Sequence, residues 1–238
     1  MSYRPNKKIF SVFLGSAKVS FSTIIANKFF KMLKYKAIIF DLGGVIVNLD
    51  QDRTIRSFKR LNIDLDDLNE KLPVFKQYET GHVNTETFIQ TIKAELKGNA
   101  SDIEISTAWN NMILDVPAER IEVLKELRKY YKIFILSNTN ELHIQEFTKL
   151  FEIDHPKENW ENLFDKIYYS HILGIRKPNV EAWQHILNDN NLHANETIFI
   201  DDTNMHFKAA DSIGIKSIWA KKPIGEWFLE EVQNLENL

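Results

Sequence analysis

The stretch AIIFDLGGV, residues 37–45, decides the fold class of this chain of 238 residues. Its first four residues are apolar without alternation, which indicates a strand buried on both faces and therefore a parallel sheet. Similar runs follow at residues 133–136, 166–169, 197–200 and 216–219. Helical patterns separate them, such as residues 119–130, where apolar side chains share one face. This alternation predicts an α/β fold with a doubly wound, Rossmann-like parallel sheet.

Residues 50–117 break the alternation, because they contain helical patterns only. Residues 85–97 show the clearest pattern, and Asn84 before them is a favourable N-cap. Further helices are expected over residues 65–76 and 103–114. We therefore predict an all-helical cap domain over residues 50–117, inserted into an α/β core formed by residues 36–49 and 118–238.

The first 35 residues differ in character from the rest of the chain. Residues 1–35 contain several lysines and no acidic residue, and their longest apolar stretch, residues 9–17, is interrupted by serine and glycine. A membrane-spanning helix needs about 20 apolar residues, so none is expected here. We interpret residues 1–35 as an N-terminal extension with a non-native start, natural translation beginning at Met32. An amphipathic surface helix and a targeting peptide are the alternatives.

Composition excludes several classes of protein. With 44% hydrophobic and 26% charged residues, the chain resembles an ordinary globular protein. Its 30 basic and 33 acidic residues give a net charge of −3, which argues against a nucleic-acid partner. Cysteine is absent, so no thiolate nucleophile, disulfide or zinc–cysteine site exists. We expect a cytoplasmic protein, monomeric or weakly dimeric, with no membrane partner.

Polar residues follow four of the predicted strands, where ligands bind in open α/β sheets. Any one of them is more simply explained as the end of a strand or the cap of a helix. All four sets together, in this order, favour one site instead. The residues are Asp41 after the first strand, Ser137 and Asn138 after the second, Arg176 and Lys177 beyond the third, and Asp201 and Asp202 after the fourth.

These four elements resemble the motifs of the haloacid dehalogenase-like hydrolase superfamily, over about residues 36–219. The motifs here are FDLGGV (40–45), ILSN (135–138), GIRKP (174–178) and FIDDT (199–203). The helical insertion looks like that superfamily's cap of the first type. The most similar group has glycine two residues after the nucleophile, as at Gly43 here, and includes bacterial phosphatases of glucose 1-phosphate. The resemblance implies hydrolysis of a small-molecule phosphate ester.

Electrostatics explain why a carboxylate site of this kind needs a cation. The attacking carboxylate and the phosphate ester are both anionic, and a divalent metal ion bridging them offsets the repulsion. We predict that Asp41 is the nucleophile and forms an aspartyl phosphate. Oxygen ligands favour Mg²⁺. Asp41, Asp202 and the backbone carbonyl of Gly43 are its expected ligands, with Asp201 one shell further out or acting through water.

The remaining motif residues are expected to bind the phosphoryl group. Ser137 and the backbone N–H of Asn138 would donate hydrogen bonds to its oxygens. Lys177 would neutralise its charge and keep Asp41 ionised. Arg176 is interpreted as a structural or surface residue, and His206 as part of a helix surface.

Gly43 is the main departure from the superfamily pattern, because most of its phosphatases carry an aspartate there as general acid and base. Such a group typically contributes about 10²–10⁴-fold to the rate. Without it, the enzyme would prefer leaving groups that need little protonation, or a cap residue or water would substitute, or turnover would be lost. Tyr78, Glu79 and His82, around Gly81, are the candidate substrate contacts of the cap.

Three functions remain open from sequence. The favoured one is a Mg²⁺-dependent phosphatase acting on a small phosphorylated metabolite such as a sugar phosphate. A catalytically weak binding or regulatory module is the second. The third is a metal-free dehalogenase, or less readily a mutase. Dehalogenases of the superfamily lack the acidic pair of the fourth motif, whereas Asp201 and Asp202 are present here.

Overall fold

The computed structural model describes residues 11–14, 17–20, 35–63, 72–96 and 99–225. The chain divides into two compact units, residues 1–34 with 228–238, and residues 35–227. In the first unit, β1 (Ser11–Leu14) pairs with β2 (Ala17–Ser20) in antiparallel fashion. The alternative of a surface helix is therefore wrong for these residues, whose backbone is extended. The expectation of a non-native start stays a prediction.

The second unit is built on a five-stranded sheet with the spatial order β5-β4-β3-β6-β7. All of its neighbouring strands are parallel, as expected from their unbroken apolar runs. The central strand, β3, is buried along its whole length. The strands are β3 (Ala37–Phe40), β4 (Lys132–Ser137), β5 (Lys166–Tyr169), β6 (Thr197–Asp201) and β7 (Lys216–Trp219).

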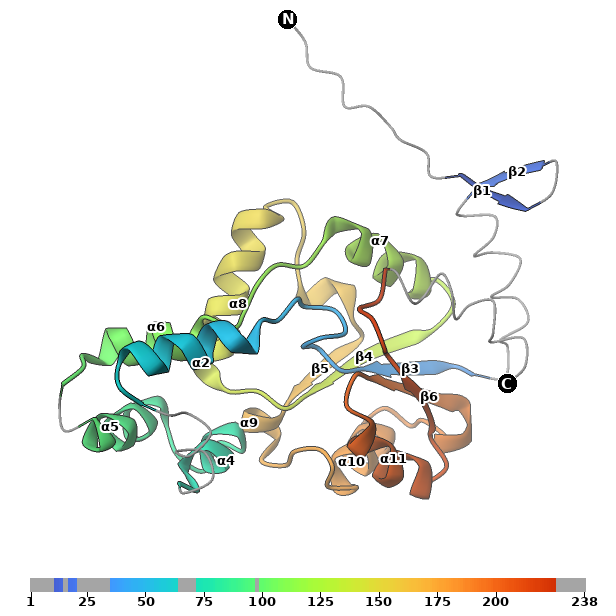
Figure 1. Ribbon diagram of the computed structural model, residues 1–238. Helices are drawn as coiled ribbons and strands as arrows, with labels where there is room; N and C mark the ends of the chain where they lie inside the picture. The colour runs from blue at the N-terminus through green and yellow to red at the C-terminus, as the bar shows by residue number, and fades with distance from the viewer. Residues whose placement is uncertain (1–10, 15–16, 21–34, 64–71, 97–98, 226–238) are drawn as a thin grey trace, which may run out of the picture. The chain divides into compact units, whose positions relative to one another are not determined.

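Helices cover both faces of this sheet, which confirms the doubly wound α/β fold. Helices α7 and α8 lie on one side and α10 and α11 on the other (Figure 1). Trp183 of α10 is fully buried and packs edge-on against Phe199 of β6, with ring centroids 5.2 Å apart. These helices are α7 (Ala118–Leu127), α8 (Glu141–Asp154), α10 (Glu181–Asp189) and α11 (Phe207–Ser212). Shorter helices are α9 (Ser170–Leu173), η2 (Glu161–Leu163), η3 (Ala194–Glu196) and η4 (Asn204–His206).

The segment between β3 and α7 is helical wherever the structure describes a regular element. Its helices are α2 (Gln51–Arg60), α4 (Val74–Glu79), α5 (Thr85–Glu95) and α6 (Asp102–Asn110). They lie beyond the carboxyl ends of the strands (Figure 1). They enclose an apolar cluster of their own, in which Phe75, Phe88 and Trp109 contact one another. The predicted domain boundaries at residues 50 and 117 stay predictions, because residues 35–227 form one compact unit.

The ends of these helices show where local rules apply. Asn84 caps α5 as predicted, because its side chain accepts a hydrogen bond from the backbone N–H of Thr87. The predicted helix over residues 65–76 agrees with α4 over residues 74–76, but α4 begins only after Pro73 and continues to Glu79. Proline lacks an N–H and cannot continue a helix, although it can begin one. Residues 64–71 lie outside the described part of the chain.

Two antiparallel connections join the inserted helices to the sheet. The backbone N–H of Asn48 donates to the carbonyl of Asp115, and the N–H of Leu114 donates back to the carbonyl of Asn48. The Asn48 side chain also donates to the Asp115 carboxylate at 2.9 Å. Asp50 then caps α2, where its carboxylate accepts from the N–H of Arg53. The chain therefore enters and leaves the inserted segment side by side.

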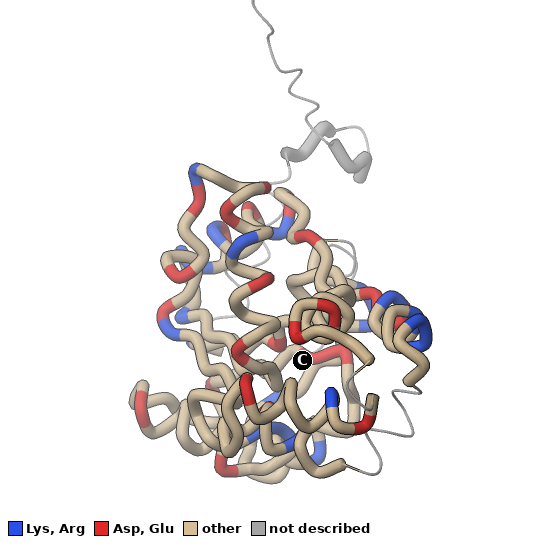
Figure 2. The backbone as a smooth tube through the Cα atoms, turned by 90° about the vertical axis from the view of Figure 1, so that its left-hand side faces the viewer, with Lys and Arg blue, Asp and Glu red and all other residues tan. Residues whose placement is uncertain are grey.

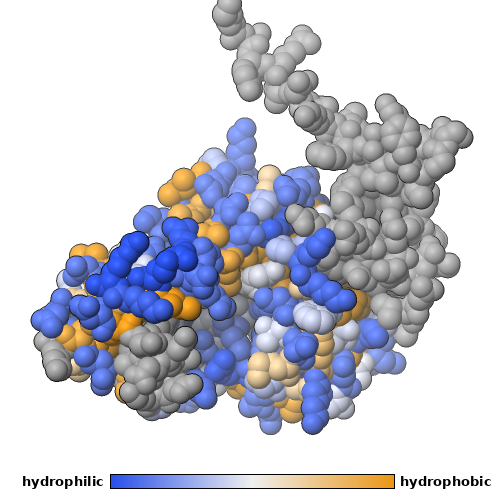
Figure 3. Space-filling model, in the orientation of Figure 1, coloured by the Kyte–Doolittle hydropathy of each residue, from blue (hydrophilic) through white to orange (hydrophobic). Residues whose placement is uncertain are grey.

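The surface of the described residues is mixed in charge. Acidic and basic residues are interspersed along the chain (Figure 2). The outer face of α2 is strongly hydrophilic (Figure 3), while Thr54 and Phe58 of the same helix are buried. Among the described residues, no helix combines the length and the hydropathy that crossing a membrane requires.

Candidate active site

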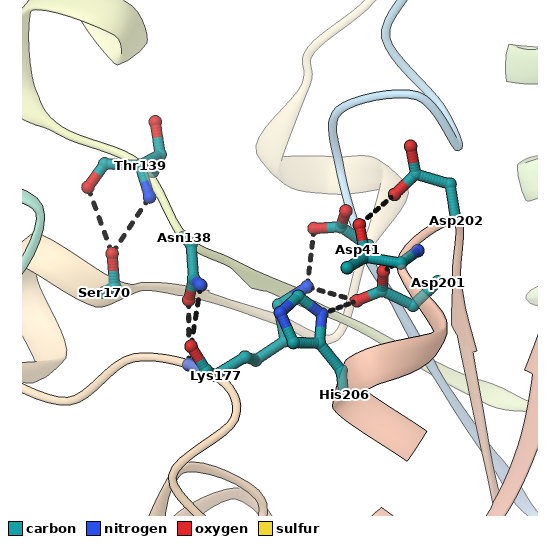
Figure 4. A network of polar contacts seen from close by, with 9 residues as sticks. Asp41, Asn138, Thr139, Ser170, Lys177, Asp201, Asp202 and His206 are labelled. Atoms are coloured by element: carbon teal, nitrogen blue, oxygen red, sulfur yellow. Dashed lines mark hydrogen bonds and ion pairs between the residues drawn. The ribbon is translucent and has the colours of Figure 1, made fainter. Parts of the chain in front are cut away.

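The carboxyl ends of β3 and β6 bring two of the predicted carboxylates together. Asp41 directly follows β3, and its backbone N–H donates to the carbonyl of Ile200 in β6. The ammonium group of Lys177 lies between Asp41 and Asp201, at 2.7 Å from Asp41 Oδ1 and 2.6 Å from Asp201 Oδ2 (Figure 4). Only 1% of the Lys177 side chain is exposed. Lys177 is therefore a buried cation held between two carboxylates.

Asp201 has a complete set of protein partners. Besides Lys177, its Oδ2 contacts Nδ1 of His206 at 2.9 Å, and its Oδ1 accepts from the backbone N–H of Thr203 at 2.7 Å. Burial pushes the pKa of this carboxyl upward, but Lys177 and His206 outweigh burial and lower the pKa to about 2. Asp201 is therefore ionised near neutral pH, and each of its two oxygens has at least one protein partner.

The other two carboxylates of the cluster are less well satisfied. Burial raises the pKa of Asp41 to about 6; Lys177 opposes this shift and Asp201 adds to it. Burial likewise raises the pKa of Asp202. Burial disfavours the charged form of Lys177, but the two carboxylates it contacts outweigh this and raise its pKa. Three carboxylates thus share one lysine and one histidine, a charge distribution that a cation would relieve.

The donor set suits a hard divalent cation. Asp41, Asp201 and Asp202 each offer one oxygen atom, and these atoms lie within 4.8 Å of one another. Carboxylate oxygens with space for water are the ligands Mg²⁺ prefers. Gly44 lets the loop after β3 approach this cluster. Its φ is +74°, and a Cβ atom at this position would lie 2.2 Å from Asp202 Oδ2.

The Asn138 side chain fixes the loop that carries Lys177. Its amide oxygen accepts from the Lys177 N–H at 2.8 Å, and its amide nitrogen donates to the Lys177 carbonyl at 2.9 Å. Next along the chain, Thr139 exchanges two hydrogen bonds with the Ser170 hydroxyl (Figure 4). Ser137 ends β4 and is 4% exposed. The predicted phosphate-binding turn is thus tied to the lysine loop across the β4–β5 edge of the sheet.

A cavity of about 490 Å³ lies above these groups, between the strand ends and the inserted helices. Most of the residues predicted for the site line it: Asp41, Gly43, Ser137, Asn138, Lys177 and Asp202. Asp201 is not among the lining residues, and its side chain is fully buried. The cavity is also lined by residues of α2, α4 and α6.

Of the three contacts expected from the cap, Glu79 alone lines this cavity. Tyr78 is 2% exposed, and its hydroxyl bonds Thr85 and accepts from the N–H of Leu142. His82 is exposed and contacts the Thr80 hydroxyl. The structure therefore places Tyr78 in the packing between inserted helices and core, and His82 at the outer surface of the turn.

Sequence alone indicates a helix-surface position for His206 and a structural or surface role for Arg176. His206 is 8% exposed and contacts Asp201, so its interpretation as a helix-surface residue is wrong. Arg176 lines the cavity and pairs with Glu79 of α4, Nη2 to Oε2, at 3.1 Å. The spacing of five residues from Asp201 to His206 was the only local signal. The Arg176–Glu79 pair spans residues far apart in sequence and left no such signal.

Comparison with known proteins agrees with this geometry. The family model for haloacid dehalogenase-like hydrolases matches residues 38–220. The chain belongs to this family. A structure of a haloacid dehalogenase family enzyme from Bacteroides thetaiotaomicron is 31% identical to this hydrolase, with a TM-score of 0.76, covering 82% of this chain and 98% of that one. A structure of the same enzyme in complex with magnesium and inorganic phosphate gives 30% identity and a TM-score of 0.72, covering 82% of this chain and 99% of that one.

Two characterised relatives of this hydrolase are phosphatases by name. The D-ribitol-5-phosphate phosphatase of Bacteroides thetaiotaomicron is 28% identical over 187 residues, covering 76% of this chain and 90% of the relative. The sesquiterpene phosphatase of Aspergillus oryzae is 27% identical over 184 residues, covering 76% and 87%. A dehalogenase structure of 16% identity, with a TM-score of 0.53, shares the fold alone.

Proposed function

We propose that this hydrolase is a Mg²⁺-dependent phosphatase of small phosphorylated metabolites. The observation that carries the proposal is the buried cluster in which Lys177 lies between Asp41 and Asp201, beside Asp202. The named relatives support it, because both are phosphatases. The alcohols in their names, D-ribitol and a sesquiterpene, differ widely, so the phosphate group is the feature that the two substrates share. Sugar phosphates are the substrate class that the sequence resemblance implies.

Asp41 is the proposed nucleophile. Its carboxylate oxygen attacks phosphorus, the bond from phosphorus to the ester oxygen breaks, and the departing alkoxide takes up a proton from water, because Gly43 offers no acid. Water then hydrolyses the aspartyl phosphate and regenerates the carboxylate. Lys177 keeps Asp41 ionised by opposing the effect of burial on its pKa. Ser137 and the backbone N–H of Asn138 are the proposed donors to the phosphoryl oxygens, because both residues line the cavity beside Asp41.

Asp41, Asp202 and the Gly43 carbonyl are the proposed ligands of Mg²⁺. Asp201 is proposed to act one shell further out, which agrees with its occupied oxygens. When bound, the ion reduces the repulsion between the attacking carboxylate and the phosphate. We also propose that the inserted helices act as the cap, because α2, α4 and α6 close the cavity opposite the strand ends.

The test is phosphate release from p-nitrophenyl phosphate. We expect steady turnover with Mg²⁺, loss of turnover with EDTA, and recovery when Mg²⁺ is restored. Asp202→Asn should raise the Mg²⁺ concentration needed for half-maximal rate, whereas Asp154→Asn, an exposed acid at the end of α8, should not. Turnover indifferent to EDTA would contradict the proposal, and halide release from a haloacid without metal would favour the dehalogenase. Binding of phosphate esters without turnover would favour the weak binding module.

A further inference from the structure

The cavity has two chemically different walls. Charged and polar groups of the strand ends surround the proposed position of the phosphate. The opposite wall is apolar, and it consists of side chains from α2, α8 and the connections to the inserted segment. Its members are Leu49, Ile55, Met112, Ile113, Ile144 and Phe147. Leu49 and Ile113 are neighbours in an isolated antiparallel bridge, so the two connections form one continuous part of this wall.

The polar groups on this side of the cavity already have protein partners. The hydroxyl of Thr54 donates to the Trp109 carbonyl at 3.1 Å. Nε2 of His143 contacts the same carbonyl at 3.2 Å, and its Nδ1 lies 3.1 Å from the side-chain nitrogen of Asn140. The His143 ring also stacks on Trp109. Burial lowers the pKa of His143 to about 4, so the ring is neutral near pH 7. A substrate hydroxyl would therefore meet groups whose hydrogen bonds are made.

Glu79 and Gln51 are the other polar side chains from the inserted helices among the described lining residues. Glu79 forms an ion pair with Arg176 at 3.1 Å, so the carboxylate oxygen that makes this contact is already engaged. Gln51 is exposed at the start of α2. Among the described residues on this side of the cavity, hydroxyl recognition therefore falls to the exposed amide of Gln51 and to the Glu79–Arg176 pair, while the other polar groups already have partners.

Leu49 extends the apolar wall up to the loop that carries the nucleophile. A Cβ atom on Gly43 would lie 2.5 Å from Leu49 Cδ1, so the leucine methyl occupies the space next to Gly43. An acid at position 43 would project into this space. The alcohol that leaves from the phosphate therefore departs beside a methyl group, and a carbon chain attached to it lies against the apolar wall.

We infer that the cavity selects phosphate monoesters of predominantly apolar alcohols, carrying an aliphatic chain, over phosphates of polyols and sugars. The inference rests on the proposed phosphatase function for the position of the phosphate. Burying a methylene group against an apolar wall strengthens binding by about fourfold. Each hydroxyl placed there without a partner weakens it instead.

A series of straight-chain alkyl phosphates, from butyl to octyl, tests this directly. The parent alcohols have nearly the same acidity, so the series separates contact with the wall from the effect of the leaving group at Gly43. With Mg²⁺ present, kcat/KM should rise by about fourfold per methylene until the wall is filled. Hexyl phosphate should exceed D-ribitol 5-phosphate, which is also the ester of a primary alcohol.

Helix α8 offers a matched pair of variants. Ile144 lines the cavity, whereas Ile153 in the same helix is 66% exposed. Ile144→Asn should flatten the dependence on chain length, and Ile153→Asn should leave it unchanged. If circular dichroism shows that Ile144→Asn does not fold, Met112→Gln replaces it as the variant of the apolar wall, with the same expected result.

The possible outcomes separate this inference from the proposed function. A flat or falling alkyl series, with polyol phosphates turned over best, would overturn the inference and leave the phosphatase intact. If no ester is turned over, the phosphatase proposal fails. The apolar subsite is then tested by calorimetric binding of alkylphosphonates of the same chain lengths. Affinity that rises with chain length and is reduced by Ile144→Asn supports the apolar subsite. Affinity independent of chain length overturns it.

Discussion

At the residue scale, the cluster around Lys177 combines charges that are costly to bury separately. Its ammonium group contacts Asp41 and Asp201 with almost no exposure to solvent. Such groups stay charged only when partners compensate for lost hydration. Asp201 receives three contacts and is fixed, whereas burial raises the pKa of Asp41 and Asp202. The fixed anion and the fixed cation thus hold Asp41 in position, with oxygen atoms of Asp41, Asp201 and Asp202 within 4.8 Å of one another.

Gly43 provides the first prediction at this scale. No positive φ constrains Gly43, so Leu49 is the obstacle to a side chain there. Gly43→Asp alone should therefore gain little, while Gly43→Asp combined with Leu49→Ala should accommodate the acid. In wild type, the rate of phosphorylation should rise steeply as the pKa of the leaving alcohol falls. The double variant should flatten this dependence and speed alkyl esters by at most about 10²–10⁴-fold.

The measurement is the single-turnover rate against leaving-group pKa, with Leu49→Ala as the control. A flat plot for wild type under saturating Mg²⁺ would show that another residue supplies the proton or that chemistry is not limiting. An unchanged slope in a folded double variant would show that a carboxyl group at position 43 cannot reach the ester oxygen.

At the element scale, the turn between α4 and α5 contacts the core at α9. Gly81 has a φ of +68°, and a Cβ atom there would lie 2.1 Å from the carbonyl oxygen of His171 in α9. The same end of α4 carries Glu79, which pairs with Arg176. A small residue at the turn therefore permits the contact that closes this side of the cavity.

Gly81→Ala should lower kcat/KM, because the turn must move away from α9. Glu79, which ends α4 just before the turn, would move together with it. Gly174→Ala is the matched control: its φ is +75°, but a Cβ atom there would meet nothing within 4 Å. Both variants should lose about 1 kcal/mol of stability from backbone strain. Gly81→Ala alone should also lose activity, measured by phosphate release. Equal activity in the two variants would contradict a role for this contact.

Helices α6 and α8 meet at His143, which stacks on Trp109 with ring centroids 4.8 Å apart. Burial lowers the pKa of His143 from its ordinary value to about 4. The unfolded chain binds this proton below about pH 6.5, and the folded chain only near pH 4. Folding stability therefore falls as the pH drops across this window, by an amount on the order of 2 kcal/mol.

His143→Gln should remove this part of the acid sensitivity, so its melting temperature should fall less between pH 6.5 and pH 4 than that of wild type. His193→Gln, at an exposed histidine before η3, should keep the wild-type dependence. Thermal unfolding monitored by circular dichroism gives the comparison. Parallel pH dependences for wild type and His143→Gln would refute the assignment of the buried neutral ring.

Sequence reasoning succeeded where the signal was local. Five short runs rich in β-branched and aromatic residues located the parallel strands, and the polar residues after them met at one edge, since parallel strands share their direction. It failed where contacts join distant residues. Leu49 beside Gly43, Arg176 with Glu79 and the burial of Tyr78 depend on how the inserted helices dock, which periodicity along one helix does not specify.

At the scale of the whole molecule, the entire candidate site lies within the compact unit of residues 35–227. A chain beginning at Met32 should therefore fold and turn over phosphate esters like the full chain. Its melting temperature and its kcat/KM with p-nitrophenyl phosphate should match those of the full chain. A loss of solubility or activity on this truncation would show that residues 1–31 contribute to the folded enzyme.

The central claim is that phosphate passes through a covalent bond to Asp41. Acid-quenched single turnover, followed by mass spectrometry of proteolytic peptides, tests it most directly. We predict that one phosphoryl group appears on the peptide containing Asp41 and decays as phosphate is released. Asp41→Asn should show no such species and should lose more than about a hundredfold in rate, a barrier increase of about 2.7 kcal/mol. Undiminished turnover in Asp41→Asn, or a phosphoryl group on another residue, would contradict the account.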